Sequence, residues 1–233
     1  EVTLGENAML PVSTIKALRR DALAQLDAAR AATSVPFSAV SPAQLPAAGS
    51  VRGTVIRLSD AAQYSAALDR HAVILPLFTP SETFAAIAAH RTAPTGVEIP
   101  RGVFGGTAAV SAALTAAKAA GAAFVLCGNC NAIPAARAAK LPIVGGFGLN
   151  ITNRAAVDFF AENGLAATLL SPELSFAQMA FARDASLPCG VLLYGRLPLM
   201  LTRNCPRKAA GADCRRCKKS GVLCDRKKAR FPV

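Results

Sequence analysis

The sequence predicts an α/β fold in which parallel strands alternate with helices. Short apolar segments recur from residue 51 onward, and each is followed by an amphipathic helical pattern that ends at a Gly or Pro. Strands that alternate with helices in this way form parallel βαβ units. The apolar segments are nearly continuous rather than alternating, so we expect a sheet that is covered on both faces or closed on itself.

Seven such apolar segments predict seven strands, spaced in the later units by about 20 to 25 residues. They are residues 51–58, 71–78, 96–100, 122–127, 142–148, 166–171 and 189–194. The best single architecture is a TIM-barrel-like (β/α) repeat, complete or lacking one unit. An open, doubly wound sheet is the alternative.

Helical patterns fill the intervals between these strands. They cover residues 60–69, a helix that begins at Ser81, and residues 108–120, 133–139, 154–163 and 176–183. The periodicity of apolar residues also predicts a leading helix over 14–30, with Ser13 as its N-cap. Residues 31–50 are rich in Ala, Ser and Pro, which is typical of a linker. We therefore divide the chain into a leading helix with its linker, 1–50, and a barrel-like domain, 51–233.

The composition argues against membrane and secreted proteins. The best candidate for a membrane span, residues 105–130, contains Lys118 and several glycines, and no basic segment followed by an apolar core opens the chain. Seven cysteines is an odd number, and the pair Cys214-x-x-Cys217 favours a metal or cluster in a reducing compartment over disulfides. We expect a cytoplasmic protein with no membrane partner. Because the chain starts with Glu1, we expect it to be part of a longer protein.

The positive charge is concentrated at the C-terminus. Residues 203–233 hold 11 Lys and Arg against two Asp, a net charge of +9 out of +12 for the whole chain. Such a patch attracts RNA or another polyanion. The alternatives are a solvated loop or a surface covered by the rest of a longer protein.

Polar residues follow four of the predicted strands where each strand ends. These ends are 127–129, 148–150, 171–173 and 194–196. In a barrel the carboxyl ends of the strands meet on one rim, which carries the active site. Glu173, Tyr194 and Arg196 are the candidate catalytic residues. Asn150 and Ser171 are the candidates for substrate binding.

The alternative role for polar residues at these ends is helix capping, as for Asn153 and Ser175 before the helices that follow them. Glu173 follows Pro172 and is least explained by capping, so it can be an acid or base, or an ion-pair partner of Arg196. Nothing supports serine–histidine or zinc-protease chemistry, because no Gly-x-Ser-x-Gly or His-Glu-x-x-His motif occurs. We expect both histidines, His71 and His90, to be structural.

The basic C-terminal segment also carries a strong metal-ligand pattern. Its cysteines are Cys205, Cys214, Cys217 and Cys224. Four thiolates at this spacing suit a four-iron cluster or a tetrahedral zinc ion, and neighbouring Lys and Arg favour the thiolate form. Spacing alone does not separate iron–sulfur from zinc. Cys127 and Cys130 form a second Cys-x-x-Cys, for which we expect a role as small buried hydrophobes.

Several stretches resemble peptidase family U32, the collagenase-like proteins, and in particular the C-terminal half of its large members. The stretches are Leu169-Leu-Ser-Pro-Glu-Leu174, Leu193-Tyr-Gly-Arg-Leu-Pro-Leu-Met200, Asn204-Cys-Pro206, Leu223-Cys-Asp-Arg226 with Phe231-Pro232, Gly146-Phe-Gly-Leu-Asn150, and residues 6–26. The resemblance implies a TIM-barrel-like fold. It also implies that a missing N-terminal half of the same protein is a partner of this chain. The family's Ser-Tyr-Ser-Gly-x-Cys segment is absent here and would belong to that half.

The resemblance further implies a function. Members are classed as peptidases without established protease residues, and related members are implicated in oxygen-independent hydroxylation of quinone precursors and in hydroxylation of tRNA or ribosomal RNA. Some bind a 4Fe–4S cluster through cysteines that follow a strand with a Tyr/Phe-Gly-x-x-Pro-Leu motif. Cys205, Cys214 and Cys217 match those positions, whereas Cys224 departs from the pattern.

Three hypotheses follow from these observations. The first is iron–sulfur-dependent hydroxylation of RNA, either tRNA or rRNA, with the RNA held by the basic segment 203–233. The second is a peptidase whose C-terminal loop is stabilised by a metal. The third is a non-catalytic half in which zinc braces the loop and the basic patch docks a partner.

Overall fold

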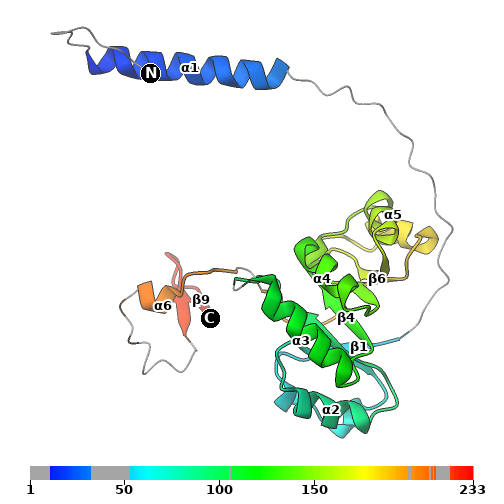
Figure 1. Ribbon diagram of the computed structural model, residues 1–233. Helices are drawn as coiled ribbons and strands as arrows, with labels where there is room; N and C mark the ends of the chain where they lie inside the picture. The colour runs from blue at the N-terminus through cyan, green and yellow to red at the C-terminus, as the bar shows by residue number, and fades with distance from the viewer. Residues whose placement is uncertain are drawn as a thin grey trace. The chain divides into compact units, whose positions relative to one another are not determined.

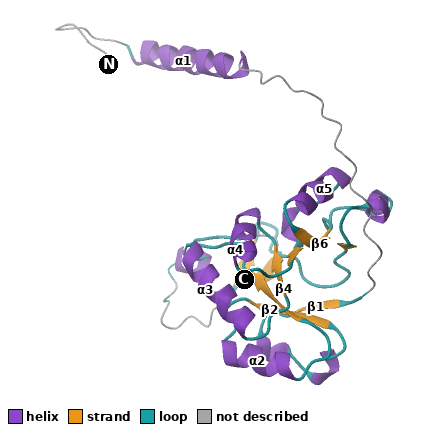
Figure 2. Ribbon diagram, turned by 45° about the vertical axis from the view of Figure 1, so that its right-hand side comes forward, coloured by secondary structure: helices purple, strands orange, loops and turns teal. Residues whose placement is uncertain are grey.

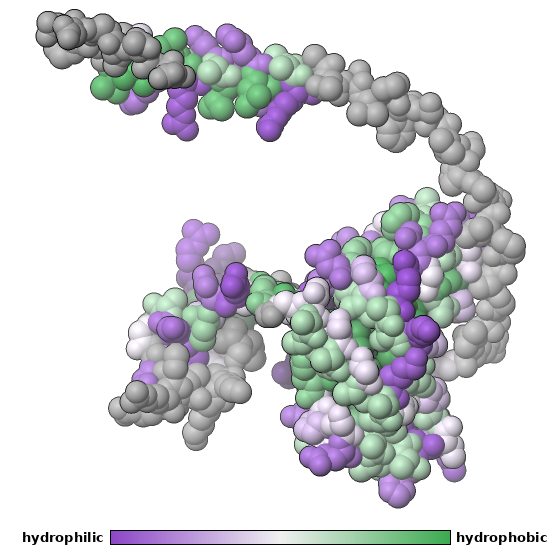
Figure 3. Space-filling view, viewed as in Figure 1, coloured by the Kyte–Doolittle hydropathy of each residue, from purple (hydrophilic) through white to green (hydrophobic). Residues whose placement is uncertain are grey.

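The computed structural model describes residues 11–32, 53–104, 106–198, 201–209, 211, 213 and 221–232. The chain divides into two compact units, Glu1–Ala43 and Gln44–Val233. The first unit contains α1 (Val12–Ala32), which confirms the predicted leading helix. Ile15, Leu18 and Leu26 are all about half exposed on α1. Figure 3 shows hydrophobic surface along this helix.

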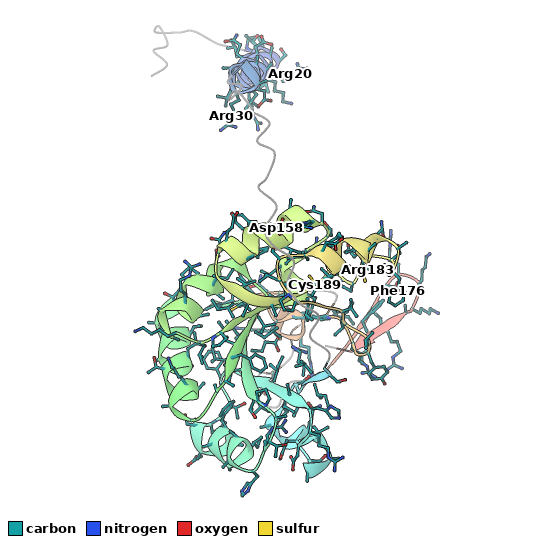
Figure 4. All side chains as sticks on the ribbon, turned by 90° about the vertical axis from the view of Figure 1, so that its right-hand side faces the viewer. Arg20, Arg30, Asp158, Phe176, Arg183 and Cys189 are labelled. Carbon is teal, nitrogen blue, oxygen red and sulfur yellow. The ribbon has the colours of Figure 1, made fainter. Side chains whose placement is uncertain are left out.

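Seven parallel strands form one sheet in the second unit, and each overlaps a predicted strand, although β7 is much shorter than the predicted 189–194. They are β1 (Val55–Arg57), β2 (Ala72–Pro76), β3 (Thr95–Ile99), β4 (Phe124–Cys127), β5 (Ile143–Gly145), β6 (Leu165–Leu169) and β7 (Cys189–Gly190). Each strand pairs with the next one in the sequence, in the order β1 to β7 (Figures 1 and 2). The sheet curls into a half-barrel, which confirms the TIM-barrel-like class (Figure 4).

Four α-helices cover the convex side of the curled sheet (Figure 4). They are α2 (Ser81–Ala89), α3 (Thr107–Ala119), α4 (Ile133–Ala138) and α5 (Arg154–Glu162). Alternate strand residues such as Val73, Val97 and Val125 meet the helix side chains in one core. The parity of side chains along a strand then places the intervening residues on the concave face.

Two of the predicted helices are 3-10 helices rather than α-helices. Residues 60–69 form two 3-10 turns, Ala61–Gln63 and Ala66–Leu68, because the Gln63 side chain folds back onto the backbone N–H of Asp60 and Ser65 is extended. Residues 176–183 likewise give way to a 3-10 helix over Gln178–Asp184. In both places a short polar side chain competes for backbone hydrogen bonds that an α-helix would use.

The C-terminal segment contains a short helix and a hairpin that the sequence did not predict. The helix is α6 (Pro206–Ala209), and the antiparallel pair is β8 (Val222–Cys224) with β9 (Arg230–Pro232). Asp225 closes the hairpin, since one of its carboxylate oxygens accepts hydrogen bonds from the N–H groups of Lys227 and Ala229, each at 2.8 Å. Within the residues that the structure describes, no helix has both the length and the apolar character needed to cross a bilayer.

Candidate functional site at the strand carboxyl ends

The predicted substrate-binding residues, Asn150 and Ser171, lie in direct contact. The Ser171 hydroxyl donates a 2.7 Å hydrogen bond to Asn150 Oδ1, which joins the end of β6 to the loop after β5. Ser171 is fully buried, and its oxygen also accepts a 3.3 Å hydrogen bond from the Glu173 backbone N–H. Asn150 adopts a left-handed conformation, with φ 51°, that turns the chain at this point. The strand ends therefore converge here as the sequence predicts.

The same rim continues toward β3 and β4. Asn129 Nδ2 donates a 3.0 Å hydrogen bond to the carbonyl of Arg101, and the Arg101 guanidinium lies 5.1 Å from the centre of the Phe147 ring. Gly148 permits this arrangement, because a Cβ there would lie only 2.4 Å from the Gly128 carbonyl oxygen. Arg101 is thus a cation of the rim that sequence reasoning missed.

The three predicted catalytic residues are all exposed, and none of the ion pairs in the described part of the chain joins two of them. Glu173 and Arg196 form none of the ion pairs found among the described residues, so the predicted pairing of these two side chains is wrong. Tyr194 is 96% exposed and lies four residues beyond Gly190, where β7 ends, so it is not at the strand end that the sequence predicted. The catalytic roles of Glu173, Tyr194 and Arg196 remain predictions.

A cavity of about 330 Å³ opens at the carboxyl ends of β6 and β7. Its lining includes Ser171, Leu174, Phe176, Met179, Val191 and Leu193. Most of these side chains are apolar, and the cavity lies on the face where barrel proteins carry their active sites. The site at this rim is therefore an apolar pocket with the Asn150–Ser171 pair beside it.

Two charged residues on the concave face were also missed. Arg57 on β1 and Glu98 on β3 form an ion pair at 2.5 Å, with β2 between them, and the Glu98 side chain is largely buried. The sequence signal that could have revealed this pair was the glutamate, Glu98, within the mostly apolar strand Thr95–Ile99. The pair provides the concave face with a charged contact that the apolar pattern does not reveal.

Both histidines lie at the opposite end of the barrel. His71 immediately precedes β2, and His90 follows α2, where the chain turns back toward the start of β3. The chain has no further histidine. A histidine-based catalytic group therefore cannot form at the rim from this chain. The structural role predicted for both residues remains a prediction.

The predicted metal ligands are divided between described and undescribed parts of the chain. Cys205 and Cys224 are exposed and free, whereas Cys214 and Cys217 lie outside the described residues. Among the residues that the structure describes, no three His, Cys, Asp or Glu side chains gather in a way that could hold a metal ion. Coordination by four cysteines remains a prediction.

Cys205 is a fully exposed thiol whose pKa is lowered by its surroundings. The backbone N–H groups of Lys208 and Arg207 point at its sulfur and hold the pKa of the thiol below its ordinary value, and the nearby side-chain charges act in the same direction. By contrast, burial raises the pKa of Cys127 to about 12 and that of Cys189 to about 11. Cys205 therefore forms the thiolate at a lower pH than either buried cysteine does.

The two cysteines of the second Cys-x-x-Cys pair differ in their exposure. Cys127 is fully buried in β4, which confirms its predicted role as a small hydrophobe. Cys130 is exposed, so the same prediction is wrong for it, because the 3-10 turn Cys130–Ala132 directs it toward solvent. Cys130 provides a matched control for experiments on Cys205.

The lowered pKa of Cys205 predicts its alkylation behaviour in the metal-free chain. Iodoacetamide reacts with the thiolate, so the alkylation of Cys205 should reach its half-maximal rate at a lower pH than that of a short unstructured cysteine peptide. Mass spectrometry of the peptide that contains Cys205, across a pH series, measures this midpoint. A midpoint equal to that of the free peptide would contradict the assignment.

Comparison with known proteins finds a likeness among solved structures but none among family models or curated proteins. No family model matches the sequence, and no curated protein matches it. Among solved structures, the chain is similar to one described as the structure of the U32 peptidase Mk0906, with 13% sequence identity and a TM-score of 0.47. The match covers 66% of this chain and 73% of that one.

Proposed function

We propose that this chain is a U32-type protein that binds an iron–sulfur cluster and acts in the hydroxylation of RNA in the cytoplasm. The cluster ligands would be Cys205, Cys214, Cys217 and Cys224. The observation that carries the proposal is Cys205, an exposed thiol with a lowered pKa, at the start of a segment that contains three more cysteines and a net charge of +9.

The donor set fits such a cluster. Four thiolates within one short segment match the ligand number of a 4Fe–4S cluster, and the surrounding Lys and Arg offset the negative charge that the thiolates introduce. When bound, the cluster would supply one-electron transfer. Zinc can use the same four ligands, so metal identity is the first point that an experiment must decide.

The charge and shape of the hairpin support an RNA partner. The turn between β8 and β9 presents Arg226, Lys227 and Lys228, all of them exposed, on a loop that Asp225 holds closed. Lys228 adopts a left-handed conformation with φ 63°, which is uncommon for a residue other than glycine. Three cations on one closed turn suit contacts with a phosphate backbone.

The peptidase hypothesis has less support at this site. The rim has no histidine, and two serines line its pocket. The hydroxyl of Ser171, which is fully buried, donates to Asn150, and the hydroxyl of the exposed Ser175 donates to Gln178, so neither donates to a base. A serine nucleophile needs an accessible oxygen and a base within hydrogen-bond reach. The exposed carboxylate of Glu173 is the remaining acid or base on which a peptidase mechanism could depend.

Deletion of the encoding gene tests the proposal in the cell. We expect one hydroxylated nucleoside of tRNA or rRNA to lose one oxygen atom in the deletion strain, as measured by mass spectrometry of digested RNA. The wild-type gene and the Cys130→Ser variant should restore it, whereas Cys205→Ser should not. An RNA nucleoside profile that deletion leaves unchanged would refute the proposed function.

A further inference from the structure

We propose that the apolar pocket at the ends of β6 and β7 receives one unpaired base of RNA, stacked against Phe176. This inference rests on the proposed function and names the part of the substrate that the rim would hold. No sequence motif includes Phe176, which lies outside the four predicted strand ends.

The pocket has a size and lining suited to a flat ring. Its volume of about 330 Å³ lies at the lower end of the range typical for small-molecule sites. Leu174, Met179 and Val191 supply apolar walls, and each of these side chains also packs against the main core. The walls are therefore fixed in place without a ligand.

Phe176 is an exposed aromatic ring on a closed turn. Its side chain is 83% exposed although it lines the pocket. The turn is held by Gln178, whose side-chain oxygen accepts hydrogen bonds from the Ser175 N–H at 2.8 Å and from the Ser175 hydroxyl at 2.9 Å. Figure 4 shows Phe176 on the segment that follows β6, with Arg183 farther along it. An exposed ring on a fixed backbone provides a stacking surface for a base.

The polar groups of the pocket explain which feature of a base would be recognised. The Ser171 hydroxyl is committed to Asn150 and to the Glu173 N–H, and the Ser175 hydroxyl is committed to Gln178. Few side-chain groups remain to read the hydrogen-bonding edge of a base. Recognition would depend on the face of the ring, which is open only in unpaired RNA.

Charge favours RNA over an apolar peptide as the occupant. The residues that line the pocket carry no charge, and the exposed charged residues near them in the sequence, Arg183 and Arg196 with Glu173 and Asp184, balance in sign. The chain that leaves it, however, enters residues 203–233 with their net charge of +9. A neutral apolar pocket that leads into a strongly basic segment matches a nucleotide, whose base is apolar on its faces and whose phosphate is anionic.

Fluorescence of 2-aminopurine tests the inference with the full chain. The probe is a single-stranded RNA of about 12 nucleotides, long enough for one binding site, with 2-aminopurine at its centre, and the same strand paired in a duplex is the comparison. We expect the single strand to bind with quenched fluorescence. Phe176→Ala should weaken this binding by about tenfold, as loss of one stacking contact predicts, and should reduce the quenching.

Phe159→Ala is the matched control, because Phe159 is an exposed phenylalanine on α5 that does not line the pocket. This variant should bind like the wild type. If Phe176→Ala and wild type bind the single strand equally, the inference fails while RNA binding stands. If neither the single strand nor the duplex binds, both the RNA-binding part of the proposed function and the inference fail. If an apolar peptide instead competes at this pocket, the occupant is a peptide and the inference is overturned.

Discussion

A Cys205→Ser chain is expected to lose its bound iron when it is purified without oxygen, whereas a Cys130→Ser chain is expected to retain it. Loss of a direct thiolate ligand should lower metal affinity by more than the roughly 10–100-fold that loss of an outer-shell partner costs. Cys205 is one of the proposed cluster ligands, and the pKa of its thiol is lowered by the N–H groups of Lys208 and Arg207. Iron content per chain, measured beside protein concentration, gives the result.

The comparison between these two variants separates coordination from a general effect on the fold. Both cysteines are exposed and free in the structure, so serine should be tolerated by the fold at either position. Equal iron content in Cys205→Ser and wild type would mean that the ligands lie elsewhere in the chain.

Gly148→Ala is expected to destabilise the barrel-like unit by about 1–3 kcal/mol, the usual cost of forcing an extra carbon into a packed site. The new methyl group would lie 2.4 Å from the Gly128 carbonyl oxygen and 3.0 Å from Arg101 Nε. A backbone carbonyl cannot swing aside as a side chain can, so the rim between β4 and β5 must shift. Urea unfolding followed by circular dichroism measures the change in free energy of unfolding.

Gly53→Ala is the control for this experiment, since no atom lies within 4 Å of a Cβ at that position. It should change the free energy of unfolding by a few tenths of a kcal/mol at most, within the range usual for surface changes. A Gly148→Ala chain as stable as Gly53→Ala would show that the close contact between the two loops does not exist in solution.

The repeated apolar segments were enough to predict the sheet. All seven strands were found because buried parallel strands have nearly continuous apolar sequences, and the order along the chain follows from βαβ connections. The contact between Asn150 and Ser171 was also predictable, because adjacent strands end at the same rim. The errors concern local structure. The Ala-rich pattern near Asp60 predicts an α-helix, but Asp60 and Gln63 close a tighter 3-10 turn there.

Other features depend on geometry that one sequence does not contain. The Arg57–Glu98 pair spans an intervening strand, so it follows from the curl and register of the sheet rather than from spacing. The pocket lined by Phe176 and Leu193 likewise requires the segment after β6 to turn back beside the end of β7. The hairpin β8–β9 was missed because its short apolar run, Val222–Cys224, lies within a strongly charged segment.

The most direct test of the central claim is the metal content and visible spectrum of the full chain purified under nitrogen. We predict a brown protein with about four irons and four acid-labile sulfides per chain, as a 4Fe–4S cluster held by Cys205, Cys214, Cys217 and Cys224 requires. A colourless protein that contains one zinc ion, or no metal, would contradict it.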